Sequence, residues 1–144
     1  MDFIGSHILS IDQFQRADID HIFSVARMME PYAHRHQVTK VLDGAILGNM
    51  FFEPSTRTKT TFELASKRLS ADFINIDISN SSTLKGESIV DMIKTLEAMS
   101  CDMFIVRHSI SGTPHYIARE VGTKISVINA GDGIHAHPTQ AMLD

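Results

Sequence analysis

Apolar residues along the chain follow two spacings, one typical of helices and one typical of buried strands. A helical stripe comprises Ile19, Ile22, Phe23, Ala26 and Met29. This stripe predicts an amphipathic helix over about residues 16–30, with Pro31 near its end. Residues 45–52 form a short, mostly apolar run. Such a run predicts a strand that is covered on both faces.

Strand and helix patterns alternate to the end of the chain. Further strands are predicted at residues 73–78, 103–106 and 125–128, and helices at 56–69, around 89–96, at 114–121 and from Pro138. This order predicts an α/β fold: a three-layer, doubly wound parallel sheet of about four strands, with helices on both faces. Ligands bind such folds outside the carboxyl ends of the strands. Chemistry is therefore expected at residues 53–58, 79–86, 107–112 and 129–140.

Composition narrows the class of protein. The chain has 144 residues, of which 43% are apolar and 21% charged, enough for one domain with a core that needs no disulfide. Its formal charge of −4 predicts no nucleic-acid partner. The single cysteine, Cys101, is expected to be a small buried residue, and it suggests a reducing compartment. No stretch approaches the ~18 apolar residues of a membrane span, so a cytoplasmic protein without membrane contact is expected.

The strongest chemical signal is the decapeptide Phe-Phe-Glu-Pro-Ser-Thr-Arg-Thr-Lys-Thr at residues 51–60, where a strand passes into a helix. Hydroxyl groups, the Arg57 guanidinium and free backbone N–H groups converge there, a combination suited to a phosphate dianion. Helix capping alone would explain the hydroxyl groups. It would not explain Arg57, whose charge opposes the helix dipole in the first turn unless an anion lies beside it. The glycines and the Gly-Lys pair of a Walker loop are absent.

This decapeptide resembles the carbamoyl-phosphate signature of the aspartate and ornithine carbamoyltransferase family. The resemblance continues in order through residues 81–87, through Val106-Arg107-His108 and through 129–140, ending in His-Pro-Thr-Gln. Lys85-Gly86-Glu87, Arg107-His108 and residues 129–133 favour the aspartate branch over the ornithine branch.

The resemblance implies domain boundaries. Residues 1–144 would be the family's N-terminal, carbamoyl-phosphate-binding domain. The C-terminal domain, which in this family binds the amino acid, has no counterpart in the chain. The last predicted helix has barely begun when the sequence stops at Asp144, so a chain cut from a longer protein is expected.

The implied activity is transfer of a carbamoyl group from carbamoyl phosphate to the amine of L-aspartate, a step toward pyrimidines. It would need no cofactor and no metal, and the family resemblance implies a homotrimer. Two alternatives stay open. The chain could be an isolated ligand-binding or oligomerisation module without activity, or it could belong to a carbamoyltransferase for another acceptor amine such as ornithine.

The resemblance also implies roles for individual residues. Those expected to hold the phosphate group are Ser55, Thr56, Arg57 and Thr58. Those expected to donate hydrogen bonds to the carbonyl oxygen as its charge grows are Thr58, Arg107 and His137. Gln140 would accept a hydrogen bond from the carbamoyl NH2 group. Ser81 and Lys85 match residues that a neighbouring subunit inserts into the site, and Glu53 matches a residue that joins the two domains on closure.

Two histidines near the end of the chain invite other interpretations. His137, before a proline at a helix start, could simply cap or pack, but Gln140 one turn later on the same side favours a site. His135 and His137 could suggest a metal. No cysteine or carboxylate cluster is expected to complete a ligand set there, so a metal is not expected. Asp132, between two glycines, is expected to shape a turn.

Overall fold

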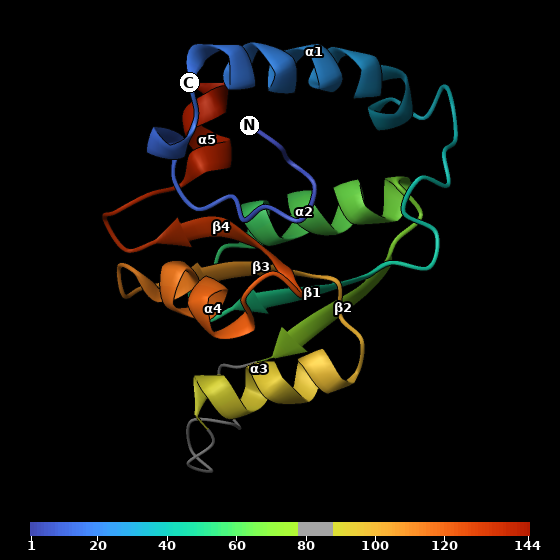
Figure 1. Cartoon of the computed structure of the whole chain (residues 1–144). Coiled ribbons are helices and arrows are strands. Elements are labelled where there is room, and N and C mark those ends of the chain that lie inside the picture. The colour runs from blue at the N-terminus through green and yellow to red at the C-terminus, as the bar shows by residue number, and fades with distance from the viewer. Residues whose placement is uncertain (78–87) are drawn as a thin grey trace.

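A computed structural model describes residues 1–77 and 88–144. Its strands are β1 (Ile46–Phe51), β2 (Asp72–Asp77), β3 (Met103–His108) and β4 (Ser126–Asp132). Its helices are η1 (Ile11–Gln13), α1 (Arg16–Ala33), α2 (Thr56–Arg68), α3 (Ile89–Ala98), α4 (Thr113–Val121) and α5 (Pro138–Leu143). The strands pair in parallel in the order β2-β1-β3-β4. Helices α1 and α2 lie on one side of the sheet and α3 and α4 on the other (Figure 1). The predicted doubly wound α/β fold is confirmed.

The largest differences from the predicted boundaries are at the ends of three elements. Helix α1 continues to Ala33, because Pro31 removes one backbone bond without preventing the His34 amide from bonding to Glu30 (3.0 Å). Strand β3 extends two residues beyond its predicted end, and β4 extends four residues beyond its predicted end, to Asp132. The added residues are largely polar, and they pair through a register irregularity between Val106 and His108.

The core has two halves, one on each face of the sheet. On the α3 and α4 side of the sheet, Phe104 of β3, Ile93 of α3 and Ile117 of α4 are fully buried in one cluster. On the α2 side, Leu47 and Ile105 form the centre of a smaller cluster. Because both faces are covered, the inner strands are buried along most of their length, as their apolar runs predicted. The rigid sheet therefore fixes the positions of the loops at its edge.

Cys101 belongs to the first half of the core and is 5% exposed, which confirms the expected burial. Burial raises the pKa of its thiol, and the neighbouring Asp102 carboxylate adds to that effect. A thiol with a raised pKa carries little reactive thiolate at neutral pH. Its part in the protein is therefore one of packing.

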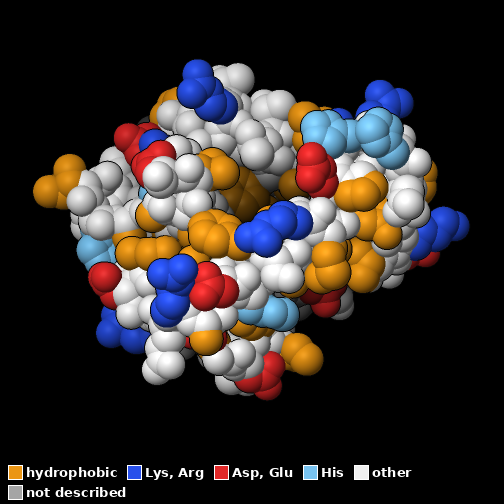
Figure 2. Space-filling view, turned by 90° about the horizontal axis from the view of Figure 1, so that it is seen from above, with side chains coloured by type: hydrophobic (Ala, Val, Ile, Leu, Met, Phe, Trp, Pro, Cys, Tyr) orange, Lys and Arg blue, Asp and Glu red, His pale blue; other side chains and the backbone are white. Residues whose placement is uncertain are grey.

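Charged side chains on the α1 face are dispersed. Lys and Arg side chains are separated by acidic, apolar and uncharged groups on this face (Figure 2).

Within residues 1–77 and 88–144, no helix has both the length and the apolar character needed to cross a membrane. The predicted polar loop at residues 79–86, including Ser81 and Lys85, falls outside the described residues.

Candidate functional site

The predicted site residues within the described part of the chain follow the carboxyl ends of β1, β3 and β4. After β1, the backbone N–H of Phe52 donates a hydrogen bond to the Arg107 carbonyl at 2.8 Å, which joins the ends of β1 and β3. His137 follows β4 as the N-cap residue of α5. Parallel strands bring these ends to one edge, as the sequence predicted.

The first turn of α2 is open to an anion. Ser55 occupies the N-cap position, but its side chain accepts no helix N–H. Its hydroxyl donates instead to the Thr58 hydroxyl at 3.1 Å. The Lys59 amide bonds to the Ser55 carbonyl at 3.0 Å, and the amides before it have no partner within the helix. The capping explanation of these hydroxyl groups therefore fails for Ser55, and the helix dipole faces outward with its N–H groups available.

Four predicted site residues line one pocket of about 250 Å³ between α2 and α5. They are Arg57, Thr58, His137 and Gln140. Ser55 and Thr56 instead line a neighbouring hollow of about 440 Å³, together with Lys59 and Asn75. The predicted phosphate-binding residues thus divide between two adjacent hollows, since successive residues of a helix point in different directions.

Arg107 links the ends of three strands. Its Nη1 donates to the Ala130 carbonyl at 2.9 Å, and its Nε lies 3.6 Å from Glu53 Oε2. The Nε atom is buried and has no hydrogen-bond partner among the described residues. Gly131, with φ of 119°, provides the space: a Cβ there would meet the Arg107 guanidinium and approach His137 Cδ2 at 3.5 Å. Arg107 therefore retains a buried donor at the site.

Glu53 lies beside Arg107 within this domain. Its side chain is 39% exposed, and its carboxylate forms the ion pair just described. The resemblance assigned Glu53 to domain closure, and that assignment stays a prediction.

The environment of His137 favours the neutral form of its imidazole. Burial lowers its pKa, and the positive charge of Arg107 lowers it further. Its Nδ1 lies 3.4 Å from the Thr139 hydroxyl oxygen, and which nitrogen carries the proton depends on the tautomer. A neutral imidazole can donate one N–H hydrogen bond to a substrate oxygen without adding a charge.

His108 belongs to the family pattern Arg107-His108 in the sequence, and in the structure its side chain also helps to hold the site edge. Its ring packs against Phe52 with ring centroids 4.8 Å apart, and its Nδ1 accepts a hydrogen bond from the Ile110 amide at 2.9 Å. Burial lowers the pKa of His108, while the Glu53 carboxylate opposes that shift. The Arg107-His108 pair at a strand end was the available sequence signal.

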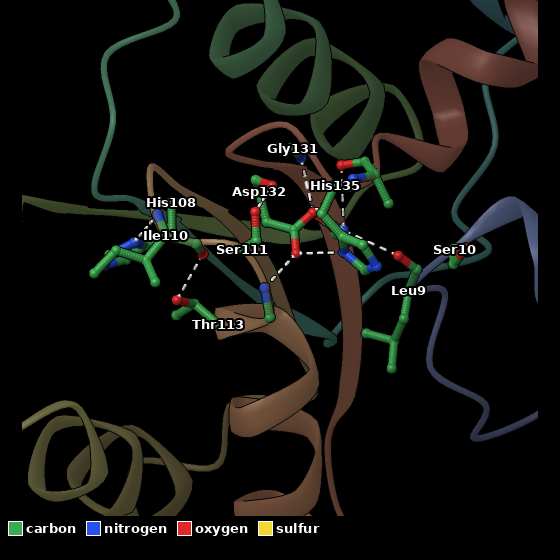
Figure 3. Close-up of polar contacts among 12 residues, drawn as sticks. Leu9, Ser10, His108, Ile110, Ser111, Thr113, Gly131, Asp132 and His135 are labelled. Atoms are coloured by element: carbon green, nitrogen blue, oxygen red, sulfur yellow. Dashed lines mark hydrogen bonds and ion pairs between the residues drawn. The ribbon is translucent and has the colours of Figure 1, made fainter.

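Asp132 organises the loops behind the site (Figure 3). It is 0% exposed, and its carboxylate accepts hydrogen bonds from Gly112 N (2.8 Å), Ala136 N (2.9 Å) and Asn129 Nδ2 (3.0 Å). His135 Nδ1 lies 2.9 Å from the same carboxylate. Burial alone would raise the pKa of Asp132, but these hydrogen bonds outweigh it, so the pKa is lowered. The predicted turn-shaping role is confirmed, and the structure extends it to the loop before α4.

The fold and site define a class: a doubly wound α/β domain that presents an open helix start, two arginines and a neutral histidine at the carboxyl edge of its sheet. A family model described as the carbamoyl-P binding domain of aspartate/ornithine carbamoyltransferase matches residues 6–144. The chain belongs to this family. The resemblance drawn from the four ordered motifs is thereby confirmed.

Similar solved structures support the same family assignment. Aspartate transcarbamoylase from Trypanosoma cruzi, in complex with aspartate and phosphate, is similar with 35% identity and a TM-score of 0.89 over 97% of this chain and 45% of that chain. The same enzyme in complex with carbamoyl phosphate and aspartate is similar with 35% identity and a TM-score of 0.84, over 97% of this chain and 43% of that chain. The catalytic subunit of M. jannaschii aspartate transcarbamoylase is similar with 37% identity and a TM-score of 0.86, over 96% of this chain and 45% of that chain. The chain thus spans less than half the length of these relatives.

Gly131→Ala is expected to displace Arg107. The added methyl group would occupy the space of the guanidinium, so the free energy of unfolding should fall by about 1–3 kcal/mol for overpacking, beyond the backbone cost of about 1–2 kcal/mol. Gly44→Ala is the matched control, because Gly44 also has positive φ (87°) but open space around it. Urea unfolding measures both losses, and NMR of the Arg107 Nε–H group reports its displacement. If Gly131→Ala and Gly44→Ala lost the same free energy of unfolding and the Arg107 Nε–H signal did not shift, the displacement of Arg107 would be contradicted.

Proposed function

We propose that this chain is the carbamoyl-phosphate-binding half of an aspartate carbamoyltransferase in pyrimidine biosynthesis. The observation that carries the proposal is the open first turn of α2, whose Arg57 and Thr58 share a pocket with His137 and Gln140. Family membership supports carbamoyl phosphate as the occupant. A phosphate group would neutralise the positive helix end and the guanidinium together.

The residues at this edge suit the reaction. The neutral amine nitrogen forms a bond to the carbamoyl carbon and the bond from that carbon to the bridging oxygen breaks. Phosphate leaves with the electron pair and takes up the proton that the amine loses. Arg57 would neutralise the leaving phosphate. Arg107, Thr58 and His137 would donate hydrogen bonds to the carbonyl oxygen as its negative charge grows. Loss of one such donor costs about 3–4 kcal/mol of transition-state stabilisation.

The proposed acceptor is L-aspartate. The T. cruzi and M. jannaschii structures are aspartate transcarbamoylases and share 35% and 37% identity with this chain. Residues 129–133 and the Arg107-His108 pair favour the same branch. The alternatives are an acceptor such as ornithine and a ligand-binding module without turnover.

Arg57→Ala tests the phosphate assignment. Removing this charge-assisted donor should weaken carbamoyl phosphate binding by about 2–4 kcal/mol, measured by calorimetry. Arg68→Ala is the matched control, because it removes the same charge from the last turn of the same helix and should leave the affinity unchanged. The phosphate assignment is wrong if Arg57→Ala binds as tightly as the parent, or if both variants lose the same affinity.

Turnover separates an enzyme part from a binding module. Alone, the chain should carbamoylate aspartate slower by orders of magnitude than a two-domain enzyme, because Arg57 and Arg107 are committed to the other substrate and orientation of aspartate is worth several kcal/mol. Joining it to an amino-acid-binding domain of the family should restore turnover with aspartate but not with ornithine. If the chain alone carbamoylated aspartate at the rate of a two-domain enzyme, its assignment as one half of the enzyme would be refuted. If the joined protein showed no turnover, the result would favour a ligand-binding module.

We further propose a cytoplasmic homotrimer in which Ser81 and Lys85 complete the neighbouring subunit's site. These residues lie outside the described residues, and the support is the family pattern Lys85-Gly86-Glu87. Lys85→Ala and Arg57→Ala chains should each bind carbamoyl phosphate poorly, yet hybrids formed by dissociation and reassociation should regain part of the binding. Hybrid trimers without recovered binding would show that Lys85 acts within its own chain.

A further inference from the structure

Three side chains outside the pocket between α2 and α5 come together behind the sheet edge. They are His115 of α4, Asp132 at the end of β4, and His135 in the turn before α5. One ligating atom from each lies within 4.8 Å of the other two. The sequence suggested a metal only through His135 and His137, with no carboxylate cluster to complete the ligand set. His137 is not part of the cluster in the structure, but the Asp132 carboxylate lies 2.9 Å from His135 Nδ1.

An Asp–His hydrogen bond by itself accounts for two members of this cluster but leaves the third unexplained. The imidazole rings of His115 and His135 lie 5.3 Å apart, edge to face. His115 Nδ1 is buried and has no hydrogen-bond partner among the described residues. A buried nitrogen without a partner is costly, and in a cluster with a carboxylate and a second imidazole it is suited to a cation.

His7 provides an internal comparison. It lines the same groove as His115, yet both of its ring nitrogens are engaged. Nε2 lies 2.8 Å from the Gly122 carbonyl, and Nδ1 accepts from the Val127 amide at 3.1 Å. His7 is therefore accounted for as a structural residue, whereas His115 is not.

We propose that His115, Asp132 and His135 form a binding site for a divalent transition metal, with Zn²⁺ as the best-matched ion. Two imidazoles and one carboxylate are a common zinc ligand set. Ligand atoms bound to tetrahedral zinc at ~2.0–2.1 Å lie about 3.3 Å apart, close to the 2.9 Å between Asp132 Oδ2 and His135 Nδ1. The His135 side chain is 44% exposed, which provides an entry path and a fourth position for water.

The surroundings of Asp132 fit this assignment. Its other hydrogen bonds, from Gly112, Asn129 and Ala136, would hold the carboxylate in place while it binds the ion. Such support of a ligand typically strengthens metal binding. The ion would fasten the start of α4 to the turn that leads into α5. The site shares no residue with those assigned to carbamoyl phosphate, so the two proposals fail independently.

Calorimetric titration of the metal-free full chain with Zn²⁺ tests the proposal. The parent should bind one equivalent, and its melting temperature should rise with added Zn²⁺. His115→Gln and His135→Asn should each weaken binding by at least the ~10- to 100-fold typical of a lost supporting partner. Asp132 is left unchanged in this test, because its removal would leave several buried donors unpaired.

The control is the double variant His34→Gln with His36→Gln. These histidines form a second, exposed pair with ring centroids 6.0 Å apart, and their loss should leave the bound equivalent intact. Visible absorption of the Co²⁺-loaded parent, compared with His115→Asn, gives a second readout. The proposal is overturned if the parent binds no Zn²⁺, or if His115→Gln and His135→Asn bind Zn²⁺ as tightly as the parent. It is also overturned if only the double variant of His34 and His36 loses the bound Zn²⁺.

Discussion

The buried carboxylate of Asp132 is the constraint on which the site edge depends. An ionised carboxylate removed from water is tolerated only when its oxygens are paired. Here the donors come from three places in the chain: the loop before α4, strand β4 itself and the approach to α5. Satisfying one charge therefore requires all three segments to meet. Because Ala136 is one of the donors, the position of His137 next to it follows from the same requirement.

A second constraint acts through Gly131 and Arg107. The backbone at Gly131 leaves room for a guanidinium that no side chain could share, and the Ala130 carbonyl holds that guanidinium from one side. Its charge also lowers the pKa of His137. A chain with a formal charge of −4 thus concentrates positive charge at one edge, where the open end of α2 adds its dipole. The proposed recognition of an anion would depend on this local arrangement and not on net charge.

The order of helices and strands could be predicted because side-chain periodicity reports local geometry, and local geometry is what distinguishes a helix from a strand. Predicted ends failed where polar residues continue a strand. Arg107, Asn129 and Asp132 interrupt the apolar runs, yet they continue β3 and β4 because each forms a hydrogen bond with another segment of the chain. Polarity in such positions predicts a loop unless the partner segments are known.

The sequence by itself determined the fold class, the family and the segments that carry the site, because these depend on spacing and on short ordered motifs. Only the tertiary structure decided that Ser55 leaves the helix uncapped, that Glu53 pairs with Arg107, and that His115 meets the Asp132–His135 pair. These contacts join residues brought together by the order and register of the strands. Neither periodicity nor residue type encodes that order, so distant residues become neighbours only once the sheet has assembled.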